Sequence, residues 1–241
     1  MDKIQGIYAA SLSVFNDDLS LNIDGTIKHA DYLINNGCHG VVLLGSTGQS
    51  QLISLGEKIQ LINSLSKSIN YKKFIIGTGL NSLVDTINLM KISISANLNY
   101  FLVMPPAYYE FKDKDVIGYF SKLIENVNDC KIILYNFEKL CGYKFSLQCI
   151  NELKKKFPQQ IVGIKDSTGN IFDKYKNENF SILLGTEKRL LSSLEIGCHG
   201  LISATCNITH SIARKVYDDF YNKTNQTLND KLCLIRQAFD K

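Results

Sequence analysis

Residues 131–136 read Lys131-Ile132-Ile133-Leu134-Tyr135-Asn136, and the pattern of this stretch decides the fold class. The run is nearly continuous in apolar residues and has polar residues at both ends. A half-exposed antiparallel strand would alternate apolar and polar residues, whereas a parallel strand is covered on both faces and is apolar throughout. The run Val41-Val42-Leu43-Leu44 has the same character. Both runs therefore predict strands of a parallel sheet.

Similar runs recur along the chain, and each is followed by a longer stretch with apolar residues at helical spacing. The predicted strands are Ile4–Leu12, Gly40–Leu44, Lys73–Gly77, Tyr100–Pro105, Lys131–Asn136, Gln160–Lys165, Phe180–Gly185 and Gly200–Ala204. The predicted helices are Asp24–Asn36, Leu55–Ile69, Leu83–Ala96, Asp113–Asn126, Leu147–Phe157, Asn170–Tyr175, Lys188–Ile196, Ile208–Tyr221 and Thr227–Phe239. This alternation of strands and helices predicts an α/β fold, a (β/α)8 TIM barrel with a short C-terminal helical extension.

The chain shows no internal domain boundary before about residue 222, because no proline- or serine-rich linker and no block of charge divides its 241 residues. We expect residues 1–222 to form the catalytic barrel and residues 223–241 to begin a C-terminal helical segment. The last helical pattern runs to the end of the sequence without a stop signal. We therefore expect this segment to be truncated or unusually short.

The composition excludes several classes of function. Hydrophobic residues make up 45% of the chain and charged residues 21%, which is enough to bury a core and too apolar for a disordered protein. The formal net charge of +4 is small and dispersed, so no nucleic acid partner is expected. The start, Met1-Asp2-Lys3-Ile4-Gln5-Gly6, has no leader pattern, and no apolar run approaches about 18 residues. Neither export nor a membrane partner is expected.

The seven cysteines include no Cys-x-x-Cys pair, so we expect reduced thiols and a cytoplasmic protein. Two of them belong to a repeat, Gly-Cys-His-Gly, at residues 37–40 and 197–200. In each copy the first glycine can end a helix as a left-handed cap. Both copies precede predicted strands and so lie at the end of the barrel opposite to catalysis, which makes a metal site the less favoured interpretation. We expect no metal and no organic cofactor.

Functional residues of a TIM barrel lie at the carboxyl ends of its strands. Lys73 and Lys131 precede their apolar runs, whereas Lys165 follows Ile161-Val162-Gly163-Ile164 and is therefore expected at the mouth of the barrel. An amine that is partly desolvated among apolar walls is a usable nucleophile towards a carbonyl group, and this predicts Schiff-base formation. The alternative is a lysine paired with a neighbouring acid such as Asp166.

Two further segments end at the same mouth. Tyr135 ends the adjacent strand, where its phenol can exchange protons with the carbinolamine that precedes an imine; the alternative is a core tyrosine. The turn Gly45-Ser46-Thr47-Gly48 offers two hydroxyls and backbone N–H groups, suited to a substrate carboxylate and a proton relay, although an ordinary polar turn would look the same. Neither a Gly-x-Gly-x-x-Gly nor a Walker pattern occurs, so no nucleotide is predicted.

Together these residues resemble the family of pyruvate-dependent class I lyases that includes dihydrodipicolinate synthase and N-acetylneuraminate lyase. The resemblance spans nearly the whole chain and rests on several independent motifs at spacings that suit a barrel. These motifs are Gly45-Ser46-Thr47-Gly48, Pro105–Tyr109, Ile133-Leu134-Tyr135-Asn136, Gly163–Asn170, and Gly200–Ser203 with Asn207.

The resemblance implies a role for each matching position. Lys165 looks like the Schiff-base lysine that condenses with the ketone of pyruvate, and Tyr135 looks like the acid/base phenol. Ser46 falls where the family has its relay hydroxyl, and Thr47 where backbone and hydroxyl hold the pyruvate carboxylate. Tyr108 falls where a tyrosine enters a neighbouring subunit's site, which implies a homodimer or a homotetramer. The positions that match residues lining the pyruvate pocket are Gly185 and Ile202.

The chemistry implied by the resemblance is an aldol reaction. Imine formation makes the pyruvate methyl group acidic, and the resulting enamine attacks an aldehyde; the reverse reaction cleaves a 2-oxo acid. The best single reaction is that of 4-hydroxy-tetrahydrodipicolinate synthase in lysine biosynthesis, and the alternative is a 2-oxo-3-deoxy sugar acid or N-acetylneuraminate aldolase. A non-catalytic 2-oxo acid-binding protein is an alternative of another class. The retained set Lys165, Tyr135, Ser46 and Tyr108 argues against it.

Departures from the family pattern bear on the aldehyde. Synthases of this family usually have an arginine five residues beyond the catalytic tyrosine, where it holds the carboxylate of the aldehyde, and this chain has Leu140 there. A neutral side chain cannot make that bidentate contact, although Lys139 would offer a point charge beside it. Other departures are Glu138 for a common proline, Gln49 for a common glutamate, and Ser13-Val14 for a common Thr-Pro.

Overall fold

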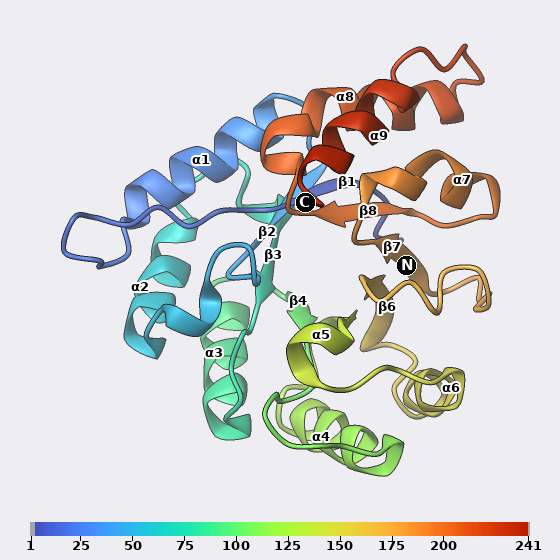
Figure 1. The fold of residues 1–241 in the computed structure, drawn as a ribbon. Helices are drawn as coiled ribbons and strands as arrows, with labels where there is room; N and C mark the ends of the chain where they lie inside the picture. Colours follow the sequence, from blue (N-terminus) through green and yellow to red (C-terminus); the bar gives the residue numbers. More distant parts are fainter. Residues whose placement is uncertain (1–2, 241) are drawn as a thin grey trace.

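The predicted strands all form, and they pair in chain order into a closed parallel barrel that the helices surround (Figure 1). The computed structural model describes residues 3–240. The strands are β1 (Gly6–Ala10), β2 (Gly40–Leu43), β3 (Phe74–Gly77), β4 (Tyr100–Val103), β5 (Lys131–Asn136), β6 (Ile161–Asp166), β7 (Ser181–Leu184) and β8 (Gly200–Ser203). The prediction of a TIM barrel is confirmed.

The helices alternate with these strands, and short polar side chains begin several of them. Asn22, Ser54, Ser82 and Ser146 each accept a backbone N–H in the first turn of α1, α2, α3 and α6 respectively. The helices are α1 (Ile23–Asn35), α2 (Leu55–Leu65), α3 (Leu83–Ser95), α4 (Asp113–Asn126), α5 (Glu138–Cys141), α6 (Leu147–Lys156), α7 (Leu190–Glu195), α8 (Cys206–Tyr221) and α9 (Asn229–Ala238). Single 3₁₀ turns are η1 (Ser50–Leu52), η2 (Tyr71–Lys73) and η3 (Glu187–Arg189).

The predicted helix Asn170–Tyr175 is wrong, because these residues form turns after β6. The buried carboxylate of Asp166 accepts backbone N–H groups from Gly169, Ile171 and Phe172 at 2.8–3.0 Å. Side-chain bonds of this kind give the backbone an alternative to helical bonding. The predicted helix Leu55–Ile69 likewise ends early, at Leu65. Helix α5 was not predicted, since four residues are too few to show a helical period.

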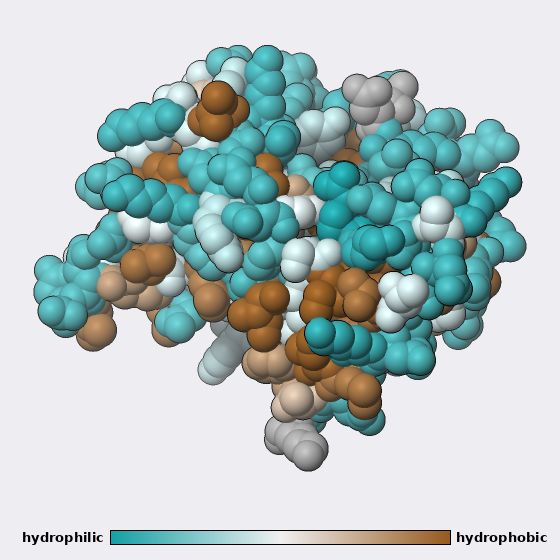
Figure 2. Space-filling model, turned by 90° about the horizontal axis from the view of Figure 1, so that it is seen from above, coloured by the Kyte–Doolittle hydropathy of each residue, from teal (hydrophilic) through white to brown (hydrophobic). Residues whose placement is uncertain are grey.

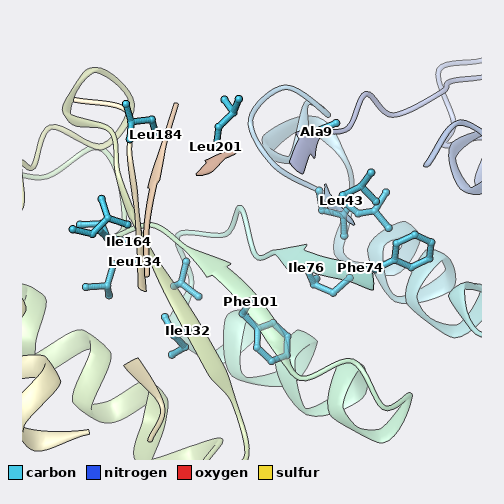
Figure 3. Packing of buried hydrophobic residues seen from close by; sticks show 14 of the residues in the cluster. Ala9, Leu43, Phe74, Ile76, Phe101, Ile132, Leu134, Ile164, Leu184 and Leu201 are labelled. Atoms are coloured by element: carbon cyan, nitrogen blue, oxygen red, sulfur yellow. The ribbon is translucent and has the colours of Figure 1, made fainter. Parts of the chain in front are cut away.

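Alternating strand residues divide into two cores, as the two-residue period of a strand requires. The side chains that fill the barrel interior are Ile4, Ala10, Val42, Ile75, Leu102, Ile133, Tyr135, Leu183 and Ile202. The outward side chains pack beneath the helices, and Figure 3 labels Ala9, Leu43, Phe74, Ile76, Phe101, Ile132, Leu134, Ile164, Leu184 and Leu201 among them. Burial on both faces is the physical reason why the strand sequences are nearly continuous in apolar residues.

The barrel closes between β1 and β8, where glycine faces glycine. Gly6 pairs with Gly200 in the parallel register, and both have positive φ, at 116° and 138°. A Cβ atom on Gly200 would lie 2.0 Å from the carbonyl oxygen of Gly6. Only glycine fits this approach of two backbones.

The two Gly-Cys-His-Gly copies lie at the amino-terminal ends of the strands, as predicted. In the first, His39 N–H donates to the carbonyl oxygen of Ile7 at 2.8 Å, and His39 Nδ1 accepts the Ile7 N–H at 3.0 Å. In the second, His199 makes the same pair of bonds with Ile182, at 2.8 and 3.1 Å. His39 therefore ties the start of β2 to the start of β1, and His199 ties the start of β8 to the start of β7.

The C-terminal segment folds back onto the barrel. Helix α9 packs against α8 and η3. The outermost residues of the two predicted domain ranges, Met1, Asp2 and Lys241, lie outside the described residues.

Figure 2 shows a largely hydrophilic face with apolar residues gathered at its lower edge. In residues 3–240 no helix combines the length and the apolarity that a membrane span needs.

Candidate active site

Lys165 and Tyr135 stand side by side at the carboxyl ends of β6 and β5. The strand register pairs them directly, and both point inward because they lie two residues beyond Gly163 and Ile133, which are also paired. Both side chains are buried, at 4% and 5% exposure. The amine nitrogen of Lys165 lies 4.3 Å from the centroid of the Tyr135 ring. The nucleophile and the phenol predicted from separate strand ends are therefore neighbours.

Lys165 forms no ion pair with Asp166, the alternative considered from the sequence. Successive strand residues point in opposite directions, and the Asp166 carboxylate faces away from the barrel interior. There it accepts the side-chain N–H of Asn136 at 2.8 Å and the backbone N–H groups of the following loop. Within residues 3–240 no carboxylate pairs with the Lys165 amine, which leaves it available to a ligand.

The hydroxyl of Ser46 extends this arrangement from a third strand end. Ser46 follows β2, and its Oγ lies 3.1 Å from the Tyr135 hydroxyl. The turn is held by the segment after β1, since Ser13 Oγ donates to the carbonyl oxygen of Gly48 at 2.7 Å. A Cβ atom on Gly48 would lie 2.8 Å from the carbonyl oxygen of Ser11, so this close approach requires glycine. A proton can therefore pass between Tyr135 and Ser46.

A cavity of about 540 Å³ opens at this mouth, within the range of small-molecule sites. Five of the seven predicted site residues line it: Lys165, Tyr135, Ser46, Thr47 and Gly185. At Gly185 a side chain is excluded, because its Cβ atom would lie 2.3 Å from Ser167 Oγ and 3.0 Å from Ser167 Cα.

The other two predicted residues do not line this cavity. Ile202 is fully buried and packs in the interior apolar cluster together with Tyr135, so it lies below the cavity floor. Tyr108 is 90% exposed, has a positive φ of 89°, and packs edge to face on Tyr109 with 5.1 Å between the ring centroids. Within one chain the structure does not bring Tyr108 to Lys165.

One residue of the C-terminal helix lines the cavity although the sequence did not predict it. Arg236 of α9 lines the cavity, 3.5 Å from the fully buried carboxylate of Glu187 and 2.9 Å from Asp240. Glu187 also accepts a hydrogen bond from Ser203 Oγ at 2.8 Å and one from Thr209 Oγ1 at 3.2 Å. No strand-end rule could find Arg236, because it reaches the mouth from outside the barrel.

A second cavity of about 380 Å³ lies on the other side of Tyr135 and Ser46, which line both. Its remaining walls are largely apolar, and Leu140 is one of them. Lys139, the residue before it, lines the cavity of Lys165 instead. Helix α5 thus presents successive side chains to two different cavities.

No metal centre accompanies this site in the part of the chain that the structure describes, where no three His, Cys, Asp or Glu side chains form a potential ligand cluster. The seven cysteines are likewise unpaired. What the arrangement offers is an amine nucleophile, a phenol and a hydroxyl relay around one cavity. These groups suffice for imine chemistry on a carbonyl substrate, since the protonated imine is itself the electron sink.

Comparisons with known proteins agree with this chemistry. The sequence profile of the Dihydrodipicolinate synthetase family matches residues 3–240. The chain is 30% identical to a 4-hydroxy-tetrahydrodipicolinate synthase of Methanococcoides burtonii, covering 98% of this chain and 83% of that one. It is 28% identical to an uncharacterized DapA-like lyase of Chloroflexus aurantiacus, over 92% and 76%.

Solved structures show the same relationship. The 4-hydroxy-tetrahydrodipicolinate synthase of Methylacidiphilum fumariolicum SolV superposes with a TM-score of 0.87 at 25% identity, covering 98% of this chain and 80% of that one. A 2-keto 3-deoxygluconate aldolase from Picrophilus torridus shares the fold, with a TM-score of 0.86 at 22% identity over 95% and 82%. The resemblance drawn from the motifs is confirmed, and the chain belongs to the dihydrodipicolinate synthetase family.

Proposed function

We propose that this class I lyase joins pyruvate to an aldehyde through a Schiff base on Lys165, and that its reaction is that of 4-hydroxy-tetrahydrodipicolinate synthase. One observation carries the proposal: the Lys165 amine lies 4.3 Å from the ring of Tyr135, whose hydroxyl lies 3.1 Å from Ser46 Oγ. Nucleophile and proton carriers thus come from three strands to one cavity. The synthase of Methanococcoides burtonii supports the choice of reaction.

In the proposed mechanism the amine nitrogen of Lys165 attacks the ketone carbon of pyruvate. Tyr135 donates a proton to the carbinolamine oxygen, water leaves, and a protonated imine remains. The Tyr135 phenolate, which accepts a hydrogen bond from Ser46, then takes a proton from the methyl group. This step restores the phenol and gives an enamine, whose carbon attacks the aldehyde. Thr47, which lines the same cavity, holds the pyruvate carboxylate.

Tyr108 takes part only if a second copy of the chain is present. Its 90% exposure and its position outside the Lys165 cavity support a role in a neighbouring subunit, and we propose a homodimer or homotetramer on this basis. The positive φ of Tyr108 holds the residue in a backbone conformation that non-glycine residues rarely adopt, a feature that often marks a functional loop.

A second candidate reaction is the cleavage of a 2-oxo-3-deoxy sugar acid. It is favoured by the position of Leu140, which lines the apolar cavity and cannot bind a carboxylate in the cavity of Lys165. We also propose a cytoplasmic location, supported by the unpaired cysteines.

The test is borohydride trapping with pyruvate, followed by intact mass and peptide mapping, with Lys165→Ala beside the wild type. A single reduced pyruvyl adduct on the Lys165 peptide is expected. Saturable pyruvate binding without an adduct would favour the binding protein. Turnover is then measured with aspartate semialdehyde and with a panel of 2-oxo sugar acids, which distinguishes the two reactions. Cleavage of a sugar acid without activity on the semialdehyde would refute the synthase assignment.

A further inference from the structure

One wall of the 540 Å³ cavity is formed by the segments that follow β7 and β8. Gly185 and Thr186 come after β7, Ala204 comes after β8, and all three line the cavity. They lie beside the nucleophile, because Leu183 of β7 pairs with Lys165 in the strand register. The position of this wall therefore affects how a small 2-oxo acid is held against the Lys165 amine.

A buried carboxylate ties the two segments of this wall together. Glu187 is 0% exposed, and it accepts a hydrogen bond from Ser203 Oγ at 2.8 Å and one from Thr209 Oγ1 of α8 at 3.2 Å. Glu187 directly follows Thr186, and Ser203 directly precedes Ala204. The bond between Glu187 and Ser203 therefore joins the end of β7 to the end of β8 at the cavity.

Arg236 supplies the positive charge that faces this carboxylate. Its Nε atom lies 3.5 Å from Glu187 Oε2, and its guanidinium also donates to Thr186 Oγ1 at 3.3 Å and to Thr205 Oγ1 at 3.4 Å. Among residues 3–240 no second cation forms an ion pair with Glu187. A buried carboxylate that loses its cation is strongly destabilising, because its charge stays out of water without compensation.

The remaining contacts of Arg236 come from its own helix. Asp240 lies 2.9 Å from the guanidinium and also pairs with Lys188 of η3, so the charges of Arg236, Lys188, Glu187 and Asp240 sum to zero. The buried side chain of α9 is Leu232, which holds the helix on the molecule. Arg236 thus arrives at the cavity already compensated, as a link between α9 and the wall.

We propose that Arg236 is a positioning residue for pyruvate, which neutralises the buried Glu187 and thereby holds the β7 and β8 segments of the cavity wall beside Lys165. The inference rests on the proposed Schiff base at Lys165 and deepens it, because a helix outside the barrel then sets how tightly the site binds pyruvate. Arg236 acts through Glu187 and does not itself bind the substrate.

The experiment measures borohydride trapping on Lys165 as a function of pyruvate concentration. The proteins are the wild type, Arg236→Gln, Arg236→Lys, and the double variant Arg236→Gln, Glu187→Gln. The matched control is Arg214→Gln. Arg214 of α8 donates to Asp218 at 2.8 Å and to the carbonyl oxygen of Gly37 at 3.3 Å, and it does not line the cavity. Circular dichroism checks that each variant is folded under the assay conditions.

Arg236→Gln should raise the pyruvate concentration for half-saturation by roughly tenfold, while the adduct at saturating pyruvate stays complete. Arg236→Lys keeps a positive charge beside Glu187, and the double variant removes both charges. Each should therefore stay within about threefold of the wild type. Arg214→Gln should leave the half-saturation unchanged.

Three results would overturn the inference. The first is an unchanged half-saturation in Arg236→Gln, and the second is an equal loss in Arg214→Gln. The third is a double variant as weak as Arg236→Gln, because Arg236 would then contact pyruvate directly. If Arg236→Gln does not fold, a tenfold loss in the double variant or in Arg236→Lys still refutes the inference. Absence of a pyruvate adduct in the wild type would instead remove the proposed function, and this inference with it.

Discussion

The two ends of the barrel treat their basic side chains in opposite ways. At the amino-terminal end, His39 and His199 each use their backbone N–H and their Nδ1 atom to bind another part of the chain. At the mouth, the amine of Lys165 rests on the ring of Tyr135 and pairs with no carboxylate among residues 3–240. The structure thus satisfies its own polar groups at one end and leaves them for a ligand at the other.

A pair of buried lysines makes the same comparison within one residue type. Lys154 belongs to α6, and its amine reaches the amino-terminal end of β6. There it donates to the carbonyl oxygens of Pro158 and Ile161, both at 2.9 Å. It is 8% exposed and Lys165 is 4% exposed, so burial alone does not distinguish them. Their hydrogen bonds do distinguish them, and on this basis we propose that Lys165 is the nucleophile and that Lys154 is structural.

The largest effect is expected at this pair. Lys165→Ala should eliminate the borohydride adduct and lower turnover by roughly 10,000-fold or more, because the nucleophile is lost. Lys154→Ala should keep the adduct but lower the free energy of unfolding by about 1–3 kcal/mol, since the buried carbonyl of Ile161 and the carbonyl of Pro158 lose their donor. Trapping mass spectrometry and urea unfolding measure the two effects. An adduct that persists in Lys165→Ala would place the chemistry elsewhere.

The next largest effect is expected at the phenol of Tyr135. Tyr135→Phe should lower kcat by roughly 100- to 1,000-fold, because it removes the proton carrier while keeping the ring beneath the Lys165 amine. Steady-state kinetics measure the loss. The matched control is Tyr143→Phe, which removes a buried hydroxyl bonded to Asp113 at 2.8 Å, away from the cavity, and should affect stability alone. Equal kcat losses in both variants would show that Tyr135 acts only through packing.

The third largest effect is expected at His39 and His199, which hold Ile7 and Ile182 by hydrogen bonds. His39→Ala and His199→Ala should each lower the free energy of unfolding by about 1–3 kcal/mol, because a buried backbone N–H of Ile7 or Ile182 loses its acceptor. Pyruvate trapping should be unchanged, since both residues lie at the opposite end from Lys165. A loss of trapping in a variant that is fully folded under the assay conditions would contradict the division between the two ends.

The smallest effect is the pH dependence that His39 and His199 give to the free energy of unfolding. Burial lowers the pKa of His39 to about 4 and also lowers the pKa of His199. The unfolded chain, with an ordinary pKa near 6.5, binds the proton first, so the free energy of unfolding should fall as the pH drops from about 6.5 towards 4. Urea unfolding at several pH values measures the slope. In the double variant His39→Ala, His199→Ala the free energy of unfolding should change less with pH between about pH 6.5 and 4.5. This interval lies above the pKa values of most carboxylates.

The strand pattern of the sequence was sufficient to predict the barrel and to place the candidate site residues at its mouth. Strands buried on both faces leave nearly unbroken apolar runs, and the polar residue that ends each run must lie at the mouth. Lys165, Tyr135 and Ser46 could therefore be placed at the mouth from local pattern, whereas their roles are implied by the family resemblance and stay predictions. Their grouping needed only the rule that parallel strands end together.

Tertiary structure decided what has no period or motif in the chain. Helix α5 is too short to show a helical pattern, and whether Lys139 or Leu140 faces the Lys165 cavity depends on its orientation. Arg236 enters the site from a helix about 70 residues beyond Lys165 in the sequence. The loop after β6 follows the bonds of Asp166 rather than its own helical propensity. These features depend on contacts between distant segments, which exist only once the barrel has closed.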